Sequence, residues 1–178
     1  MQLAPSTLIL GLGNEILRDD GVGLRAARRV AELAGDLADH VEACVATVDL
    51  LEPMAGYRRV VVVDAFLSRR HPVGTELCGA PDDLPAGFGY RSMHSLSFGA
   101  MLRLGRRLQF AMPDEMHIHG LSVEDPETFG SELSPLVQAV WSGWAERIYR
   151  REFGSRPARG ADSARHGSAG ASLGVHRA

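Results

Sequence analysis

Short apolar runs alternate with amphipathic segments along the chain. Residues 8–10 and 60–63 are apolar runs, and the second is a series of valines without intervening polar residues; residues 41–45 predict a further strand. Continuous apolar runs of this length are typical of strands buried on both faces of a parallel sheet. Residues 22–33 place apolar side chains at helical spacing, and residues 50–54 predict a short helical turn. This order of strand, helix, strand, short helix and strand predicts an α/β fold.

The second half of the chain predicts the outer elements. Residues 74–78 predict an edge strand, for which an antiparallel orientation is open. Residues 98–108 predict a helix, and residues 116–121 predict the last strand. Ser134 followed by Pro135 is typical of a helix start. The final helix is expected to bury a stripe of residues spaced by four: Leu136, Val140, Trp144 and Ile148.

Composition limits the class of protein. A chain of 178 residues predicts one domain, and a net charge of −3 gives no indication of a nucleic-acid partner. The apolar runs are too short for a membrane span of about 20 residues, and no signal peptide is evident, so we expect a cytoplasmic protein. We expect the folded domain to comprise residues 1–153. Residues 154–178 are rich in Gly, Ser, Ala and Arg, which predicts a disordered tail.

We expect structural roles for both cysteines and for the two histidines of the last predicted strand. Cys44 and Cys78 lack CxxC spacing, so neither a disulfide framework nor a zinc site is indicated, and Cys44 is expected in the core. His117 and His119 alternate onto one face of the last strand. Two imidazoles can bind a metal ion, but without a third ligand in view a structural or surface role is favoured.

Polar residues that follow the predicted strands are the candidates for chemistry. Asp19 and Asp20 come after the first strand, Asp64 closes the third, and His94 follows a loop rich in Pro and Gly. Ligands bind at the carboxyl ends of strands in open α/β sheets. Two carboxylates and one imidazole form a plausible ligand set for zinc, nickel, iron or manganese. The alternative is that Asp19 and Asp20 only cap the next helix.

Four motifs between residues 11 and 137 together resemble one known family, and the resemblance covers about residues 8–148. They are GLGNEILRDDGVG, VVVVDAF, SMHSLSF and HGLSVEDPETFGSELSPLV. The chain resembles the hydrogenase maturation proteases, which trim the C-terminus of the large subunit of nickel-iron hydrogenases. The resemblance implies a three-layer, single-domain α/β fold with a twisted, mostly parallel five-stranded sheet between helices. It also implies that Asp20, Asp64 and His94 are the metal ligands and the catalytic groups.

The resemblance further implies an aspartic-type-like endopeptidase that removes the C-terminal extension of a nickel-loaded large-subunit precursor. Nickel is then carried by the substrate, and zinc or cadmium would substitute for it in vitro. The implied partner is that precursor. The protein is expected to bind no nucleic acid, to insert into no membrane and to be a monomer.

One departure from the family pattern affects substrate choice. Members usually carry a loop resembling D-G-G-T after the second strand, whereas residues 42–47 here read EACVAT. Two alternatives stay open. One is a chaperone that recognises the nickel-loaded subunit without cutting it. The other is a nucleotide-binding module built on Gly11 and Gly13, although Ile16 occupies the place where the dinucleotide motif needs a third glycine.

Overall fold

The computed structural model describes residues 6–44, 46–83 and 98–154. Its sheet has five strands in the order β2-β1-β3-β5-β4. The strands are β1 (Thr7–Leu12), β2 (Asp39–Ala43), β3 (Arg59–Leu67), β4 (Glu76–Gly79) and β5 (Glu115–Val123). All neighbouring strands pair in parallel except β4, which is antiparallel to β5. The antiparallel edge strand agrees with the orientation allowed for residues 74–78.

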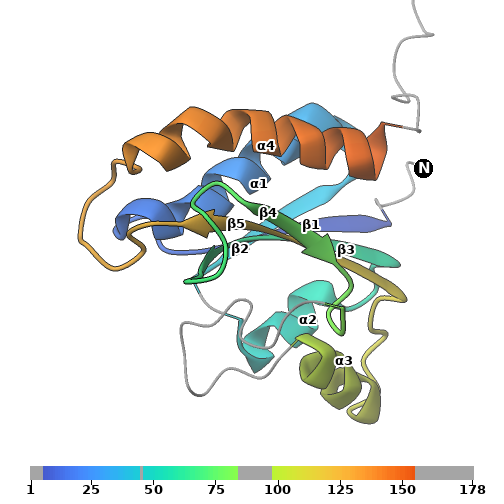
Figure 1. Ribbon diagram of the computed structural model, residues 1–178. Helices are drawn as coiled ribbons and strands as arrows, with labels where there is room; N and C mark the ends of the chain where they lie inside the picture. Colours follow the sequence, from blue (N-terminus) through green and yellow to red (C-terminus); the bar gives the residue numbers. More distant parts are fainter. Residues whose placement is uncertain (1–5, 45, 84–97, 155–178) are drawn as a thin grey trace, which may run out of the picture.

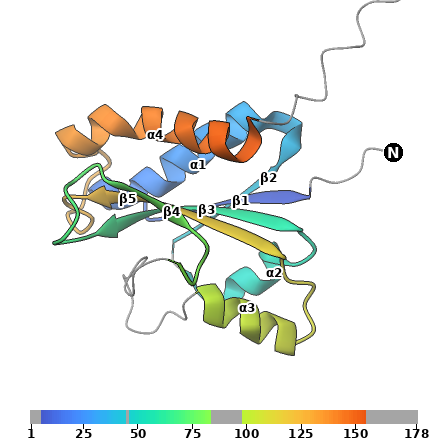
Figure 2. The same cartoon turned by 45° about the vertical axis from the view of Figure 1, so that its right-hand side comes forward.

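Helices cover both faces of this sheet. The α-helices are α1 (Val22–Ala34), α2 (Leu51–Met54), α3 (Phe98–Arg107) and α4 (Pro135–Phe153). Short 3-10 turns lie at η1 (Arg18–Gly21), η2 (Gly35–Leu37) and η3 (Val48–Leu50). The long helices α1 and α4 lie on one face, and α2 and α3 lie on the other (Figure 1). Figure 2 shows the sheet between these two layers. The predicted three-layer α/β fold is therefore confirmed.

Alternation along β3 explains how its uninterrupted apolar run is used. Val61 and Val63 join the core cluster between the sheet and the layer of α1 and α4. Val60 and Val62 join the cluster on the side of α2 and α3. Successive side chains of a strand point to opposite faces, so a strand covered on both sides needs apolar residues at every position. The double burial expected for residues 60–63 is confirmed.

Three expectations about individual residues are wrong. Leu136 does not belong to the buried stripe of α4, because its side chain is 58% exposed while that of Val137 is fully buried. Cys44 is exposed and does not lie in the core, because β2 already ends at Ala43. Asp64 does not close its strand, since β3 continues to Leu67.

The C-terminal boundary of the described part lies just beyond α4. That helix ends at Phe153, and of the predicted tail only Gly154 lies within the described residues. The division at residue 153 and the disorder of the tail stay predictions. None of the helices in the described ranges is both long enough and apolar enough to cross a membrane.

Candidate active site

Asp20 and Asp64 lie near the point of the sheet where the strand order changes direction. β1 pairs with β2 on one side and with β3 on the other, so the connections after β1 and β2 lead to opposite sides of the first strand. Ligands bind in α/β sheets at the carboxyl ends of strands beside such a switch point. Asp20 lies in η1, the element that follows β1 along the chain, and Asp64 lies in the neighbouring strand β3.

Two glycines of the first motif bring these backbone segments together. Gly13 has a φ of +138°, and a Cβ there would lie 2.0 Å from the carbonyl oxygen of Asp20. A Cβ on Gly23 would lie 2.2 Å from the carbonyl oxygen of Leu12 and 3.0 Å from the Cα of Asp64. Only a hydrogen fits in these contacts. The first turn of α1 therefore packs directly on β1 and β3, and it carries the segment of Asp20 toward Asp64.

Asp19 has a different role from its neighbour. Its side chain is fully buried. One carboxylate oxygen accepts a hydrogen bond of 2.6 Å from the backbone N–H of Ser134. The other accepts bonds from the N–H groups of Asp125 (2.9 Å) and Glu124 (3.3 Å). The helix-cap alternative is wrong for α1, whose N-cap is Gly21 and which has no side-chain cap hydrogen bond. Asp19 instead anchors the connection between β5 and α4.

Further contacts join residues 16–19 to this connection. Leu17 and Phe129 form an isolated antiparallel bridge, and the guanidinium of Arg18 lies 3.0 Å from the carboxylate of Asp125. The backbone N–H of Thr128 also donates to Asp125, and this bond is the main cause that lowers the pKa of the Asp125 carboxyl group. The first and last sequence motifs thus form one structural unit beside the candidate site.

Comparison with known proteins identifies the family. A family model described as hydrogenase maturation protease matches residues 29–151. The chain belongs to the hydrogenase maturation protease family. As a member of this family it is a peptidase, a hydrolase that acts on peptide bonds. The family resemblance of the sequence motifs is therefore confirmed.

Relatives match the maturation protease over about four fifths of its length. The chain is 26% identical over 144 residues to the hydrogenase 2 maturation protease of Escherichia coli, covering 79% of this chain and 87% of that protein. The solved structure of the hydrogenase maturating endopeptidase HybD from E. coli matches with a TM-score of 0.66 and 26% identity, over 83% of this chain and 93% of that one. HybD from Thermococcus kodakarensis matches with a TM-score of 0.60 and 27% identity, over 82% and 97%.

The two candidate carboxylates of this maturation protease are buried. Asp20 is 4% exposed and Asp64 is 9% exposed. One carboxylate oxygen of Asp64 accepts a bond of 2.8 Å from the backbone N–H of Ala65.

The third predicted ligand, His94, lies outside the described residues. Asp64 shares its strand face with Val60 and Val62, which contact the layer of α2 and α3. His94 precedes the start of α3 by four positions in the sequence. The meeting of Asp20, Asp64 and His94 stays a prediction.

The stretch that replaces the usual glycine-rich loop borders a hollow of about 280 Å³. Residues 13–16 line it from one side, and residues 42–44 at the end of β2 line it from the other. The exposed Cys44 therefore stands beside the turn that leads to Asp20. The effect of this local difference on substrate choice stays a prediction.

A second polar cluster lies under α4. Glu152 is buried and contacts both histidines of β5, with 2.9 Å from His117 Nδ1 and 2.9 Å from His119 Nε2. Burial opposes ionisation of Glu152, but its bonds with His119 and His117 outweigh burial and lower its pKa to about 2. Burial favours neutral His119, but bonds with Cys78 and Glu152 raise its pKa. The predicted placement of both histidines on one face is confirmed.

Proposed function

We propose that this maturation protease removes the C-terminal extension of a nickel-loaded large-subunit precursor of a nickel-iron hydrogenase. In this proposal Asp20, Asp64 and His94 engage the nickel ion that the substrate carries. The supporting observation is the packing at Gly13 and Gly23, which draws the segments of Asp20 and Asp64 together at the switch point of the sheet. Asp19, which binds three backbone N–H groups, is not part of the proposed set.

The burial of the two carboxylates gives this proposal a physical basis. Neighbouring carboxylates disfavour each other's ionised form, and burial adds a cost of desolvation. A divalent cation arriving with the substrate would offset both costs. The free energy of precursor binding would then depend on nickel, and the protease would discriminate against the metal-free precursor by a difference in affinity.

We assign catalysis to the same three residues. A cation held by Asp20, Asp64 and His94 could polarise a peptide carbonyl beside it, which is a known use of divalent ions in hydrolysis. A covalent mechanism would need a nucleophile beside a base. Within residues 6–44, 46–83 and 98–154, Cys78 contacts His119, but this contact does not have the geometry of a catalytic dyad. We further propose that the protein works as a cytoplasmic monomer.

The decisive experiment is incubation of the purified protein with nickel-loaded precursor, followed by mass spectrometry of the precursor's C-terminus. We expect a defined mass loss with the wild type and none with Asp20→Asn, Asp64→Asn or His94→Ala. Asp36→Asn, which changes an exposed acid in η2, is the matched control and should process normally. Equal cleavage of the metal-free precursor would refute the role of nickel.

The same materials separate the alternative functions. A non-catalytic chaperone would form a stable complex with the nickel-loaded precursor and leave its mass unchanged. A nucleotide-binding module would gain thermal stability from NAD or ATP. The proposal instead expects stabilisation by nickel, zinc or cadmium, and it expects Asp64→Asn to reduce that stabilisation.

A further inference from the structure

Three potential metal ligands from distant parts of the chain converge where β4, β5 and α4 meet. They are the Sγ of Cys78, the Nε2 of His119 and a carboxylate oxygen of Glu152, and these atoms all lie within 4.8 Å of one another. Cys78 Sγ lies 3.7 Å from His119 Nε2, and Glu152 Oε1 lies 2.9 Å from the same nitrogen. His119 and Glu152 are buried, whereas Cys78 is partly exposed.

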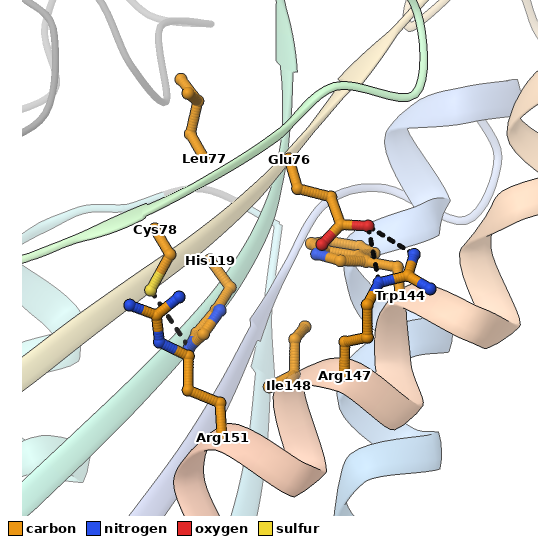
Figure 3. Close-up of a pocket in the computed structure, with 8 residues that line it drawn as sticks. All are labelled: Glu76, Leu77, Cys78, His119, Trp144, Arg147, Ile148 and Arg151. Atoms are coloured by element: carbon orange, nitrogen blue, oxygen red, sulfur yellow. Dashed lines mark hydrogen bonds and ion pairs between the residues drawn. The ribbon is translucent and has the colours of Figure 1, made fainter.

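The cluster opens into a pocket of about 400 Å³. Figure 3 shows the thiol of Cys78, from the edge strand β4, and the ring of His119, from the neighbouring strand β5, pointing toward each other. The rest of the wall comes largely from α4, including the buried ring of Trp144. Arg147, another wall residue, is bound to the carboxylate of Glu76. The pocket gives a small ligand access to the sulfur and nitrogen atoms.

The arrangement differs from a cysteine protease triad. In such a triad the thiol contacts one ring nitrogen of the histidine, and the orienting carboxylate contacts the other. Here Cys78 and Glu152 both approach Nε2 of His119. Both contacts are made to the same ring nitrogen, so the three groups do not form a relay through the ring, and their donor atoms lie close enough together to share one ion.

The distances are close to those of a tetrahedral zinc site. Zinc–ligand bonds of about 2.3 Å to sulfur and about 2.0–2.2 Å to nitrogen and oxygen imply a separation of about 3.6 Å between S and N and about 3.4 Å between N and O. The observed values are 3.7 Å for Cys78 with His119 and 2.9 Å for His119 with Glu152. A shift of about 0.5 Å in the Glu152 carboxylate would bring its separation from Nε2 to the value of a zinc site, and Cys78 Sγ lies within 4.8 Å of that carboxylate.

Neighbouring groups hold the Glu152 carboxylate in place. Its Oε2 contacts His117 Nδ1 at 2.9 Å and Arg59 at 3.3 Å. Arg59 also donates to the backbone carbonyl of Glu152 at 3.1 Å. Partners of this kind fix the orientation of a metal ligand. Oε1 contacts His119 Nε2 at 2.9 Å and also lies 3.1 Å from His117 Nδ1.

We propose that Cys78, His119 and Glu152 bind a zinc-type divalent cation, separate from the nickel-engaging site at Asp20 and Asp64. A thiolate, a carboxylate and a neutral imidazole together balance the two positive charges of the ion, and binding releases the protons that the thiol and imidazole carried. Such mixed ligands suit zinc, and the open position faces the pocket. The ion would tie the last turn of α4 to the edge of the sheet.

The two sites lie on opposite faces of the sheet. His119 pairs with Val63 of β3, whose side chain joins the core under α1 and α4. Asp64, the next residue in that strand, points to the other face. The proposal for Cys78 therefore does not depend on the proposed protease mechanism, and variants can test the two sites independently.

The test is a titration of the full chain with Co²⁺ and then Zn²⁺, after removal of metal by a chelator and in the presence of a reductant. We expect a sulfur-to-cobalt charge-transfer band, which reports the Cys78 site alone and which zinc abolishes by displacement. Cys78→Ser should remove the band and weaken zinc binding about 10-fold or more, since even the loss of a residue that orients a ligand costs about that much. Circular dichroism of Cys78→Ser checks its fold.

Two matched variants make the result specific. Cys44→Ser removes the other, exposed cysteine and should keep the charge-transfer band. Asp64→Asn should also keep it, and Cys78→Ser should still process the nickel-loaded precursor. The proposal is wrong if the wild type shows no thiolate band, if folded Cys78→Ser retains it, or if Asp64→Asn abolishes it.

Discussion

The carboxylate of Asp19 accepts a hydrogen bond of 2.6 Å from the backbone N–H of Ser134, 115 positions later in the chain. Ser134 directly precedes α4, so this bond joins the turn before α1 to the start of the last helix. The backbone N–H groups of Glu124 and Asp125 also donate hydrogen bonds to the same carboxylate. Of two adjacent aspartates, the first is thus a structural anchor.

The first prediction separates the roles of Asp19 and Asp20. Asp19→Ala should lower the free energy of unfolding by about 3 kcal/mol or more, since it leaves three backbone donors without their charged acceptor. Asp20→Asn should keep its thermal stability and abolish precursor cleavage. Urea unfolding and the mass-loss assay measure the two effects. A stable Asp19→Ala variant, or normal cleavage by Asp20→Asn, would contradict this division of roles.

The second prediction concerns the contact that joins α1 to the sheet. Gly23→Ala should destabilise the protein by about 3 kcal/mol, because its Cβ would lie 2.2 Å from the carbonyl oxygen of Leu12 and force α1 away from β1. Cleavage should fall as well, since the Asp20 segment moves with the helix. Gly21→Ala is the matched control in the same segment.

Gly21 has a φ of −68°, and its nearest contact for an added Cβ is an ordinary 3.4 Å. Its replacement should therefore change the free energy of unfolding by no more than about 1 kcal/mol. Differential scanning calorimetry on both variants makes the comparison. Equal melting temperatures for Gly21→Ala and Gly23→Ala would show that the close approach at Gly23 is not required.

The third prediction compares two adjacent arginines. Arg59 is 9% exposed, bonds to Glu152, and stacks over the ring of Phe153 at 5.3 Å. Arg58 forms an exposed ion pair with Glu115. Arg59→Ala should cost about 3 kcal/mol, because it removes one partner of a buried ion pair, whereas Arg58→Ala should cost less than about 1 kcal/mol. Chemical denaturation of both variants gives the difference, and similar losses would count against the buried network.

The sequence allowed the strands to be predicted because burial leaves a direct signature. Residues 60–63 are uninterrupted valines, and such a run suits a strand that is covered on both faces. The phase of α4 was harder to predict. Spacing by four is satisfied equally well by a series that starts at Leu136 and by one that starts at Val137. Only packing against the sheet and α1 determines that Val137 is the buried residue.

The site was predictable only where local sequence carries the information. Nothing within the pair Asp19–Asp20 distinguishes an anchor from a candidate ligand, because the residues that bind Asp19 are more than 100 positions away. The same holds for His119, whose partners Cys78 and Glu152 lie 41 and 33 positions from it. Contacts of this separation depend on the fold as a whole.

The fourth prediction concerns the chain beyond α4. Phe153 is 1% exposed and Glu152 is 6% exposed, so α4 contributes to the core up to its last residue. A chain ending at Gly154 keeps both residues and should match the full chain in melting temperature and in precursor cleavage. A chain ending at Arg151 loses the buried ring of Phe153, and we expect a loss of about 3–5 kcal/mol from that change alone. Thermal unfolding and the cleavage assay on both truncations provide the measurement. If the chain ending at Gly154 unfolds normally but no longer cleaves, residues 155–178 take part in precursor processing and the predicted tail is a functional segment.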